Sequence, residues 1–283
     1  MPYKIIDGNK IAKSILENIK NKVKNMKEKP GLALVIVGNN PASEVYVNFK
    51  EKDSKEAGFY CERYNLEEKI SEMDLLNLLN QLNNNPKIHG ILVQLPLPKH
   101  IDEKLITDSI LPHKDVDGFT SLNLGNLLSE KTILAPATAK AVIHLIESTG
   151  IKIEGKNAVV VGRSNIVGKP VALMLLEENA TVTICHSKTK NLAEYTKKAD
   201  ILVVAVGKPG LITKEMVKEG AVVIDVGINR IGNKLIGDVD FENVKEIAGF
   251  ITPVPGGVGP MTRTMLMENT LKAMELQSKV LNK

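Results

Sequence analysis

The chain has 283 residues and a mass of 30.9 kDa, and 43% of its residues are apolar, which is enough to fill the cores of two α/β domains. Its 37 Lys and Arg against 33 Asp and Glu leave a net charge of only +4, so charge gives no indication of nucleic-acid binding. Cys61 and Cys185 form neither a zinc spacing nor a disulfide framework, and no apolar run approaches the roughly 20 residues of a membrane span, so we expect a soluble cytoplasmic protein.

The first half of the chain alternates between helix and strand patterns. Apolar residues at positions 11, 15, 19 and 23 predict one stripe of an amphipathic helix, and unbroken apolar runs predict strands buried on both faces of a parallel sheet. In the predicted helix at 43–57 we expect Val45 and Phe49 to face the core. The predicted elements are a helix at 9–26, a strand at 32–37, helices at 43–57 and 71–83, and a strand at 88–95.

A second set of elements begins after Pro136. It comprises helices at 138–149, 170–179 and 191–199, strands at 158–161, 181–185, 201–206 and 221–226, and a final helix at 262–281. Strands that alternate with helices form parallel sheets with right-handed crossovers. We therefore predict a two-domain α/β protein: an N-terminal α/β domain at 1–137, completed by the C-terminal helix 263–283, and a Rossmann-like, doubly wound parallel-sheet domain at 138–262.

The turn after strand 158–161 is bounded by Gly162 and Gly168 and leads into a helix. Free backbone N–H groups and the positive end of a helix dipole favour binding of a pyrophosphate there. Because Ser164 stands where the G-x-G-x-x-G fingerprint has its second glycine, an ordinary tight turn remains the alternative.

The end of strand 181–185 indicates which dinucleotide would bind. NAD-binding units place an Asp or Glu there to accept from the ribose 2′-hydroxyl, whereas this strand is followed by His186-Ser187-Lys188. Arg163, one of only four arginines in the chain, could bind a 2′-phosphate in a bidentate manner. These residues predict NADP rather than NAD.

A candidate chemical site lies in the first half. Ser43, Tyr46 and Lys50 are spaced i, i+3, i+7 and project along one helix face, which by itself is more typical of a solvated surface. Gln94 ends the apolar strand 88–95, at the sheet edge where ligands collect, and a buried Gln needs a partner. Lys50 or a ligand would supply it.

Two further segments stand out. Asp115 and Asp117 predict either an Asx turn or a metal pair, and because no third ligand is near in sequence we expect no metal. The segment 253–262 contains three prolines and three glycines, so we expect it to be neither helix nor strand, but a rigid turn with exposed amides or a simple connector.

Together, six motifs resemble the bifunctional methylenetetrahydrofolate dehydrogenase/methenyltetrahydrofolate cyclohydrolase family over essentially the whole chain. They are Ser43-x-x-Tyr46-x-x-x-Lys50, residues 93–98, residues 114–118, residues 162–170, Asp225-x-Gly227-Ile228-Asn229 and residues 253–262. The resemblance implies NADP-dependent oxidation of 5,10-methylenetetrahydrofolate and hydrolysis of the methenyl product to 10-formyltetrahydrofolate. It further implies tetrahydrofolate partners, a role in purine biosynthesis and a homodimer, with no nucleic-acid or membrane partner.

The resemblance also implies residue roles. Lys50 and Gln94 would form the catalytic pair with Tyr46, which would stack on the aminobenzoyl ring, and Asp117 would hold the pterin. Pro255, Gly256 and Gly257 would line the nicotinamide side and contact substrate. The implied cofactor-binding residues are Gly162, Arg163, Ser164, Ile166, Ser187, Gly207, Ile228 and Thr138. One departure is Pro136-Ala137-Thr138-Ala139-Lys140-Ala141, where the family usually has Pro-Cys-Thr-Pro-x-Gly, so the helix start is less rigidly set.

In this interpretation a Lys50 whose pKa is lowered by apolar burial would relay the proton of the hydrolytic step. Short-chain dehydrogenases also use Tyr-x-x-x-Lys, but there the glycine-rich turn precedes the pair. A shikimate dehydrogenase-like enzyme shares the two-domain plan and remains an alternative, as does a non-catalytic dinucleotide-binding module.

Overall fold

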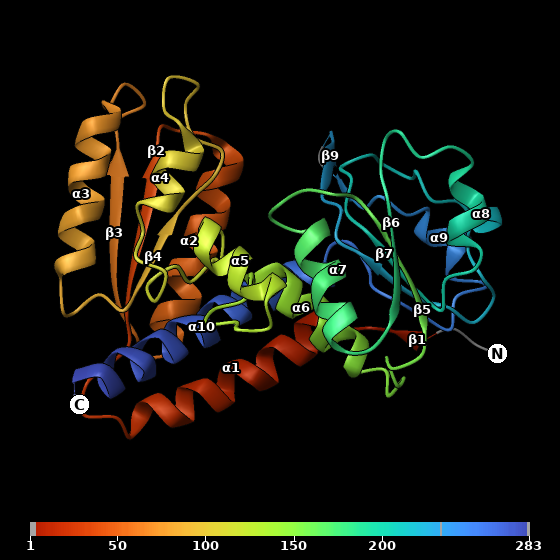
Figure 1. Ribbon diagram of the computed structural model, residues 1–283, viewed down its shortest axis with the longest axis horizontal. Helices are drawn as coiled ribbons and strands as arrows, with labels where there is room; N and C mark the ends of the chain where they lie inside the picture. Colours follow the sequence, from red (N-terminus) through yellow and green to blue (C-terminus); the bar gives the residue numbers. More distant parts are fainter. Residues whose placement is uncertain (1–3, 233, 282–283) are drawn as a thin grey trace. The chain divides into compact units, whose positions relative to one another are not determined.

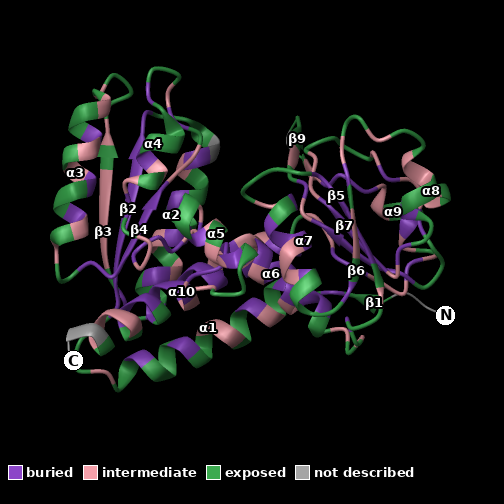
Figure 2. Ribbon diagram, viewed as in Figure 1, coloured by how far each residue is buried: buried purple, intermediate pink, exposed green. Residues whose placement is uncertain are grey.

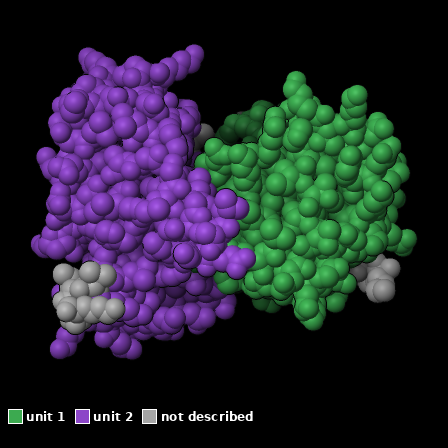
Figure 3. All heavy atoms as spheres, in the orientation of Figure 1, with its two compact units in different colours: residues 1–12, 138–262 green, residues 13–137, 263–283 purple. Residues whose placement is uncertain are grey.

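The computed structural model describes residues 4–232 and 234–281, and the chain divides into two compact units (Figures 1 and 3). Unit 1 comprises the residues up to Ala12 together with Thr138–Thr262, and unit 2 comprises Lys13–Ala137 together with the residues from Arg263 onward. The predicted domain ranges begin at residue 1 and end at residue 283, so their first three and last two residues lie outside the described part.

The division differs from the predicted one at the amino end. The prediction placed residues 1–12 with the first domain, whereas the described ones among them belong to unit 1. The reason is a short strand: β1 (Lys4–Ile5) pairs in parallel with β11 (Phe250–Ile251) and extends the sheet of unit 1. A strand of two residues carries no periodic pattern, so the sequence could not reveal this pairing.

Unit 1 is built on a six-stranded parallel sheet in the order β1-β11-β8-β7-β5-β6. The chain runs outward from β5 to β6 and then returns to β7 on the other side, so the strand order reverses beside β5, where open α/β sheets bind their ligands. The central elements are β5 (Asn157–Val161), β6 (Thr181–Cys185), β7 (Ile201–Val204) and β8 (Val222–Asp225), with helices α6 (Ala137–Glu147), α7 (Gly168–Glu177), α8 (Leu192–Thr196) and α9 (Phe241–Val244), a 3-10 turn at Lys214–Met216, and the hairpin of β9 (Asn229–Ile231) and β10 (Lys234–Ile236).

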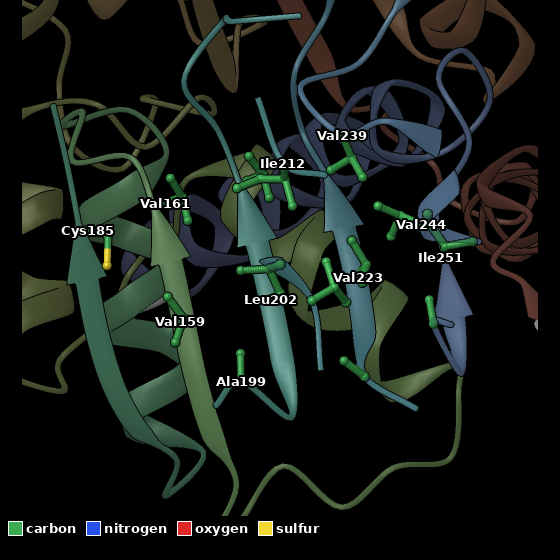
Figure 4. Close-up of a cluster of buried hydrophobic side chains, with 14 residues drawn as sticks. Val159, Val161, Cys185, Ala199, Leu202, Ile212, Val223, Val239, Val244 and Ile251 are labelled. Atoms are coloured by element: carbon green, nitrogen blue, oxygen red, sulfur yellow. The ribbon is translucent and has the colours of Figure 1, made fainter. Parts of the chain in front are cut away.

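The core of unit 1 explains its apolar strands. Val159, Val161, Leu202 and Val223 point from β5, β7 and β8 into one buried cluster (Figure 4). All four residues of β7 and of β8 are buried, as expected for parallel strands covered on both faces.

Unit 2 contains a three-stranded parallel sheet in the order β3-β2-β4. Its elements are α1 (Gly8–Lys24), whose first residues belong to unit 1, β2 (Gly31–Val37), α2 (Pro41–Glu56), β3 (Tyr60–Leu66), α3 (Glu72–Asn84), β4 (Gly90–Val93), α4 (Glu103–Asp108), α5 (Ser121–Leu128) and the part of α10 (Val258–Leu281) from Arg263 onward. Asn269 of α10 fixes that helix to the unit, because its side-chain amide donates to the carbonyls of Val116 and Ala135, both at 2.9 Å.

Two expectations were wrong. Val45 and Phe49 are 45% and 46% exposed, whereas Val47 and Lys50 of the same helix are buried, because α2 covers its sheet with the stripe that carries Lys50. Figure 2 shows that α2 has both buried and exposed residues. The proline- and glycine-rich segment is not free of helix throughout: α10 begins at Val258 rather than 262. Pro260 is tolerated there because the first helical turn has no partner for its missing N–H.

The departure at the junction leaves the helix start in place, since α6 begins at Ala137 with Ala137, Ala139 and Ala141 all buried. Among the helices of the described residues, none combines the length and apolar character needed to cross a membrane.

Candidate active site

Lys50 is a buried amine in unit 2. It lies on the inner face of α2, its side chain is largely covered, and its Nζ donates to Oε1 of Gln94 at 3.1 Å. Gln94 follows β4, and its own Nε2 donates to the carbonyl of Leu95 at 2.7 Å. The predicted pairing of Lys50 with Gln94 is therefore present in the structure.

Asp117 lies in a turn that follows a short pairing with β4. Ile91 of β4 and Asp115 form an isolated parallel bridge, and the N–H of Ile91 donates to the carbonyl of Lys114 at 2.8 Å. The turn from Asp115 to Gly118 comes directly after that bridge and carries Asp117. The carboxylate is close enough to Lys50 for the two charges to influence each other's titration.

Burial favours the neutral forms of both Lys50 and Asp117. Loss of hydration lowers the pKa of Lys50, and the charge of Asp117 opposes that shift only in part. Burial likewise raises the pKa of Asp117, with Lys50 acting in the opposite direction. A lysine with a lowered pKa carries more neutral amine near pH 7, so it can accept and return a proton.

The two aspartates of the 114–118 segment have different roles. Asp115 is buried and accepts from the N–H of Gly118, the N–H of Thr120 and the side chain of Asn123 at 2.8–2.9 Å, which is a turn-stabilising role. Asp117 lies inside that turn, and its side chain accepts none of these three hydrogen bonds. Among the described residues no group of three or more His, Cys, Asp or Glu is arranged to hold a metal.

Tyr46 lies one turn before Lys50 on α2 and is 36% exposed, so its ring is accessible to a ligand. Ser43, on the same stripe, is buried at the start of the helix, and its N–H donates to the side chain of Asn40. The stripe predicted from the sequence thus separates into a structural Ser43 and an accessible Tyr46.

The glycine-bounded turn of unit 1 has the geometry expected for a pyrophosphate. A Cβ on Gly162, whose φ is +133°, would lie 2.3 Å from the carbonyl oxygen of Ala205, and one on Gly168 would lie 2.3 Å from that of Gly162. Only glycine fits at either position. Ser164 Oγ accepts from the N–H groups of Val167 and Gly168 at the start of α7.

Between the two glycines the backbone N–H groups of residues 163–166 have no hydrogen-bond partner within the described chain. Unpaired amides at the N-terminus of a ten-residue helix are what a bound pyrophosphate requires. The turn therefore fits the phosphates of a dinucleotide, and Ile166 in it is exposed.

Arg163 and Ser187 follow neighbouring strands. Val161 pairs with Cys185, and the N–H of Gly162 donates to the carbonyl of Cys185 at 2.9 Å, so both residues stand at the same sheet edge. Both are exposed, and in the described part of the chain the Arg163 guanidinium forms no hydrogen bond or ion pair. A free guanidinium and a hydroxyl at this edge suit a phosphate ester.

The remaining predicted residues of unit 1 lie in loops, apart from Thr138, which is in the first turn of α6. Gly207 and Ile228 follow β7 and β8 and are exposed. Pro255, Gly256 and Gly257 form a turn against the start of α1: the N–H of Asn9 donates to the carbonyl of Gly256, and a Cβ on Gly8 would lie 1.9 Å from that of Gly257.

Asp225 and Asp238 form a pair of buried carboxylates. Sequence reasoning named Asp225 only as part of a family motif, without a role, and did not name Asp238. Asp225 accepts from the N–H groups of Gly227, Asp238 and Val239 at 2.9–3.0 Å. A Cβ on Gly227 would lie 2.2 Å from the Asp238 carboxyl carbon, and one on Gly237 1.8 Å from Asp225 Oδ2. The available signal was the two Asp–Gly pairs, Asp225-x-Gly227 and Gly237-Asp238, on either side of a hairpin.

Asp225 makes stability depend on pH. Burial raises its pKa to about 6 against the opposing backbone hydrogen bonds, so the protonated form is favoured in the folded state. The contribution of Asp225 to the free energy of unfolding is complete below the pKa of the unfolded state, about 4. It is lost as the pH rises through the pKa of the folded state, about 6, and amounts to about 3 kcal/mol.

We expect urea unfolding to show this as a difference between the wild type and Asp225→Asn, which cannot titrate. Relative to the variant, the wild type should lose about 3 kcal/mol of stability between about pH 4 and pH 8. Titrating groups that do not interact with Asp225 are common to both proteins and cancel. A difference that is independent of pH would contradict the prediction.

Comparisons with known proteins cover nearly the whole chain. The family model described as tetrahydrofolate dehydrogenase/cyclohydrolase, catalytic domain, matches residues 6–117, and the NAD(P)-binding domain of the same description matches residues 136–278. The bifunctional protein FolD of Moorella thermoacetica is 57% identical over 277 residues, which span 96% of this chain and 99% of the relative.

Solved structures agree with this. The bifunctional FolD dehydrogenase/cyclohydrolase of Campylobacter jejuni has 47% identity and a TM-score of 0.95 over 97% of this chain and 99% of that one. The N5,N10-methylenetetrahydrofolate dehydrogenase-cyclohydrolase of Trypanosoma brucei, complexed with NADP and an inhibitor, has 38% identity and a TM-score of 0.95 over 98% and 99%. Shikimate dehydrogenase of Thermus thermophilus, at 14% identity and a TM-score of 0.53 over 86% and 99%, shares the fold alone.

Proposed function

The chain belongs to the tetrahydrofolate dehydrogenase/cyclohydrolase family, and we propose that Lys50, bonded to Gln94 and facing Asp117, is its proton-transfer group. The protein is a bifunctional enzyme. It oxidises 5,10-methylenetetrahydrofolate with NADP and hydrolyses the resulting 5,10-methenyltetrahydrofolate to 10-formyltetrahydrofolate. The likeness to shikimate dehydrogenase is one of fold alone and does not support that activity.

The oxidation needs little from the protein's acids and bases. NADP, when bound, accepts the hydride that leaves the methylene carbon between two nitrogens, whose lone pairs stabilise the cation that remains. The protein contributes mainly by aligning the substrate with the cofactor, because holding reactants in a reactive geometry accounts for a large part of the rate enhancement. We propose that Tyr46 and Asp117 in unit 2 contact the folate, and that the turn of Pro255, Gly256 and Gly257 in unit 1 lines the nicotinamide side and contacts substrate.

The hydrolysis requires proton transfer. Water adds to the methenyl carbon, and its oxygen must lose both protons to become the formyl oxygen. One ring nitrogen gains a proton as its bond to that carbon breaks, so one proton is released overall. Lys50 is suited to this relay because burial lowers its pKa, and because Gln94 Oε1 fixes the position of its Nζ. The 3.1 Å bond between these two groups is the observation that carries the proposal.

The residues of unit 1 fit the cofactor. We propose that the amides of residues 163–166 bind its pyrophosphate, that Arg163, Ser164 and Ser187 bind the 2′-phosphate end, and that Ile166, Gly207, Ile228 and Thr138 line the rest of the site. The free guanidinium of Arg163 and the absence of a carboxylate after β6 support these roles.

The function is tested by following the reduced-nicotinamide and methenyl absorbance bands of the purified protein with each cofactor in turn. We expect methylenetetrahydrofolate to reduce NADP faster than NAD, and added methenyltetrahydrofolate to disappear without any cofactor. Turnover of shikimate instead of the folate would refute the assignment.

We also propose a homodimer located in the cytoplasm, with 10-formyltetrahydrofolate serving purine biosynthesis. The outer edge of β3 supports self-association, because this strand ends the sheet of unit 2 with unpaired backbone groups. We expect sedimentation to give twice the 30.9 kDa chain mass. A monomer at micromolar concentration would contradict the dimer while leaving the enzymatic assignment untouched.

A further inference from the structure

Asp238 connects two loops at the carboxyl edge of the unit 1 sheet. Its Oδ2 accepts from the N–H groups of Val206 and Gly207, immediately after β7, at 2.7 and 2.9 Å. Its Oδ1 accepts from the side-chain amide of Asn229, the residue after Ile228, at 2.9 Å. Gly207 and Ile228 are both proposed cofactor residues, so a single carboxylate bonds to the backbone of the first and to the side chain of the residue after the second.

The carboxylate is held with little freedom. Asp238 is 0% exposed, and Gly227 packs so closely on it that any side chain there would overlap the carboxyl group. The backbone N–H of Asp238 donates to Asp225, whose own N–H donates to Thr252 at 2.8 Å, just before the turn of residues 253–257. No lysine or arginine in the described chain forms an ion pair with either carboxylate. The charge of Asp238 is thus directed at three donors that all belong to these loops.

We propose that Asp238 is a positioning residue for the dehydrogenase reaction. It touches neither substrate nor cofactor, and it acts by holding the loops after β7 and β8 in the geometry that receives NADP. The inference rests on the proposed cofactor roles of Gly207 and Ile228. Hydrolysis of the methenyl compound uses no NADP, so the second activity of the same protein separates loss of positioning from loss of folding.

The test compares both activities in Asp238→Ala. We expect the KM for NADP to rise roughly tenfold, because two backbone donors and one amide lose their acceptor, while the cyclohydrolase rate stays within about twofold. Asp238→Asn should restore most of the affinity, since its single amide oxygen can accept both backbone N–H groups, as Oδ2 does now. Should the alanine variant fail to fold, Asn229→Ala removes one of the three donors to Asp238, together with the longer bond of the same amide to the carbonyl of Ile236 at 3.4 Å, and should raise the KM about threefold.

Asp200 provides the matched control. It lies at the opposite, amino-terminal end of the same sheet, and its Oδ2 accepts from the N–H of Asn157 at 2.9 Å. Asp200→Ala should leave the KM for NADP unchanged. An unchanged KM in Asp238→Ala, a parallel fall of both activities, or an equal rise in Asp200→Ala would each overturn the proposal. A wild type that fails to reduce NADP would instead refute the proposed function itself.

Discussion

Replacing Lys50 by methionine is expected to lower the cyclohydrolase rate by about 100-fold or more, the usual contribution of a positioned proton-transfer group. The dehydrogenase rate should fall by less than about tenfold, because hydride departure needs alignment rather than a base. Methionine keeps most of the buried volume and removes only the amine, so Val47 and the rest of the covered face of α2 remain packed. The measurement is kcat for each reaction, assayed separately on the same preparation.

Lys52→Met is the matched control, because Lys52 is an exposed lysine on the same helix, two residues away. It should leave both activities unchanged. Equal losses of the two activities in Lys50→Met would show that Lys50 chiefly positions the folate, and the proton-transfer role would then be wrong. Loss of the cyclohydrolase alone supports the role that burial and the Gln94 bond suggest.

The Lys50–Gln94 pair could be predicted because Gln94 is a polar residue in an otherwise apolar strand pattern. A glutamine at the end of an unbroken apolar strand needs a hydrogen-bond partner, and a lysine on the predicted helix at 43–57 is able to reach it. The location of Asp117 was harder to predict from spacing alone. It depends on the parallel bridge between Ile91 and Asp115, a tertiary pairing of a loop with β4 that no local pattern records.

Other features were out of reach for similar reasons. Strand β3 has a largely polar sequence, YCERYNL, because it lies at the edge of its sheet and buries little on either face. The pattern that identified β2, a continuous apolar run, is produced by burial on both sides and is absent at an edge. Asp238 resembles a surface turn residue in sequence, and only the fold brings its carboxylate under the loop after β7.

Cofactor choice gives the second large expected effect. Arg163→Ala should raise the KM for NADP about 10- to 100-fold, since a charge-assisted pair with the 2′-phosphate is worth about 1.5–3 kcal/mol. The KM for NAD, which lacks that phosphate, should change by less than about twofold. The structure supports this role, because Arg163 is exposed at the end of β5, beside the residues that follow β6, and has no partner in the described chain.

Arg230→Ala is the corresponding control, an exposed arginine of the same unit located on β9, and should alter neither KM. If Arg163→Ala weakens NADP and NAD equally, Arg163 binds the pyrophosphate common to both dinucleotides, and the preference must come from Ser187 or Lys188. If neither KM changes, the guanidinium does not contact the cofactor, and the absence of a carboxylate after β6 no longer explains selectivity by itself. A change confined to NADP shows that the preference rests on one cation placed beside a strand end that lacks an anion.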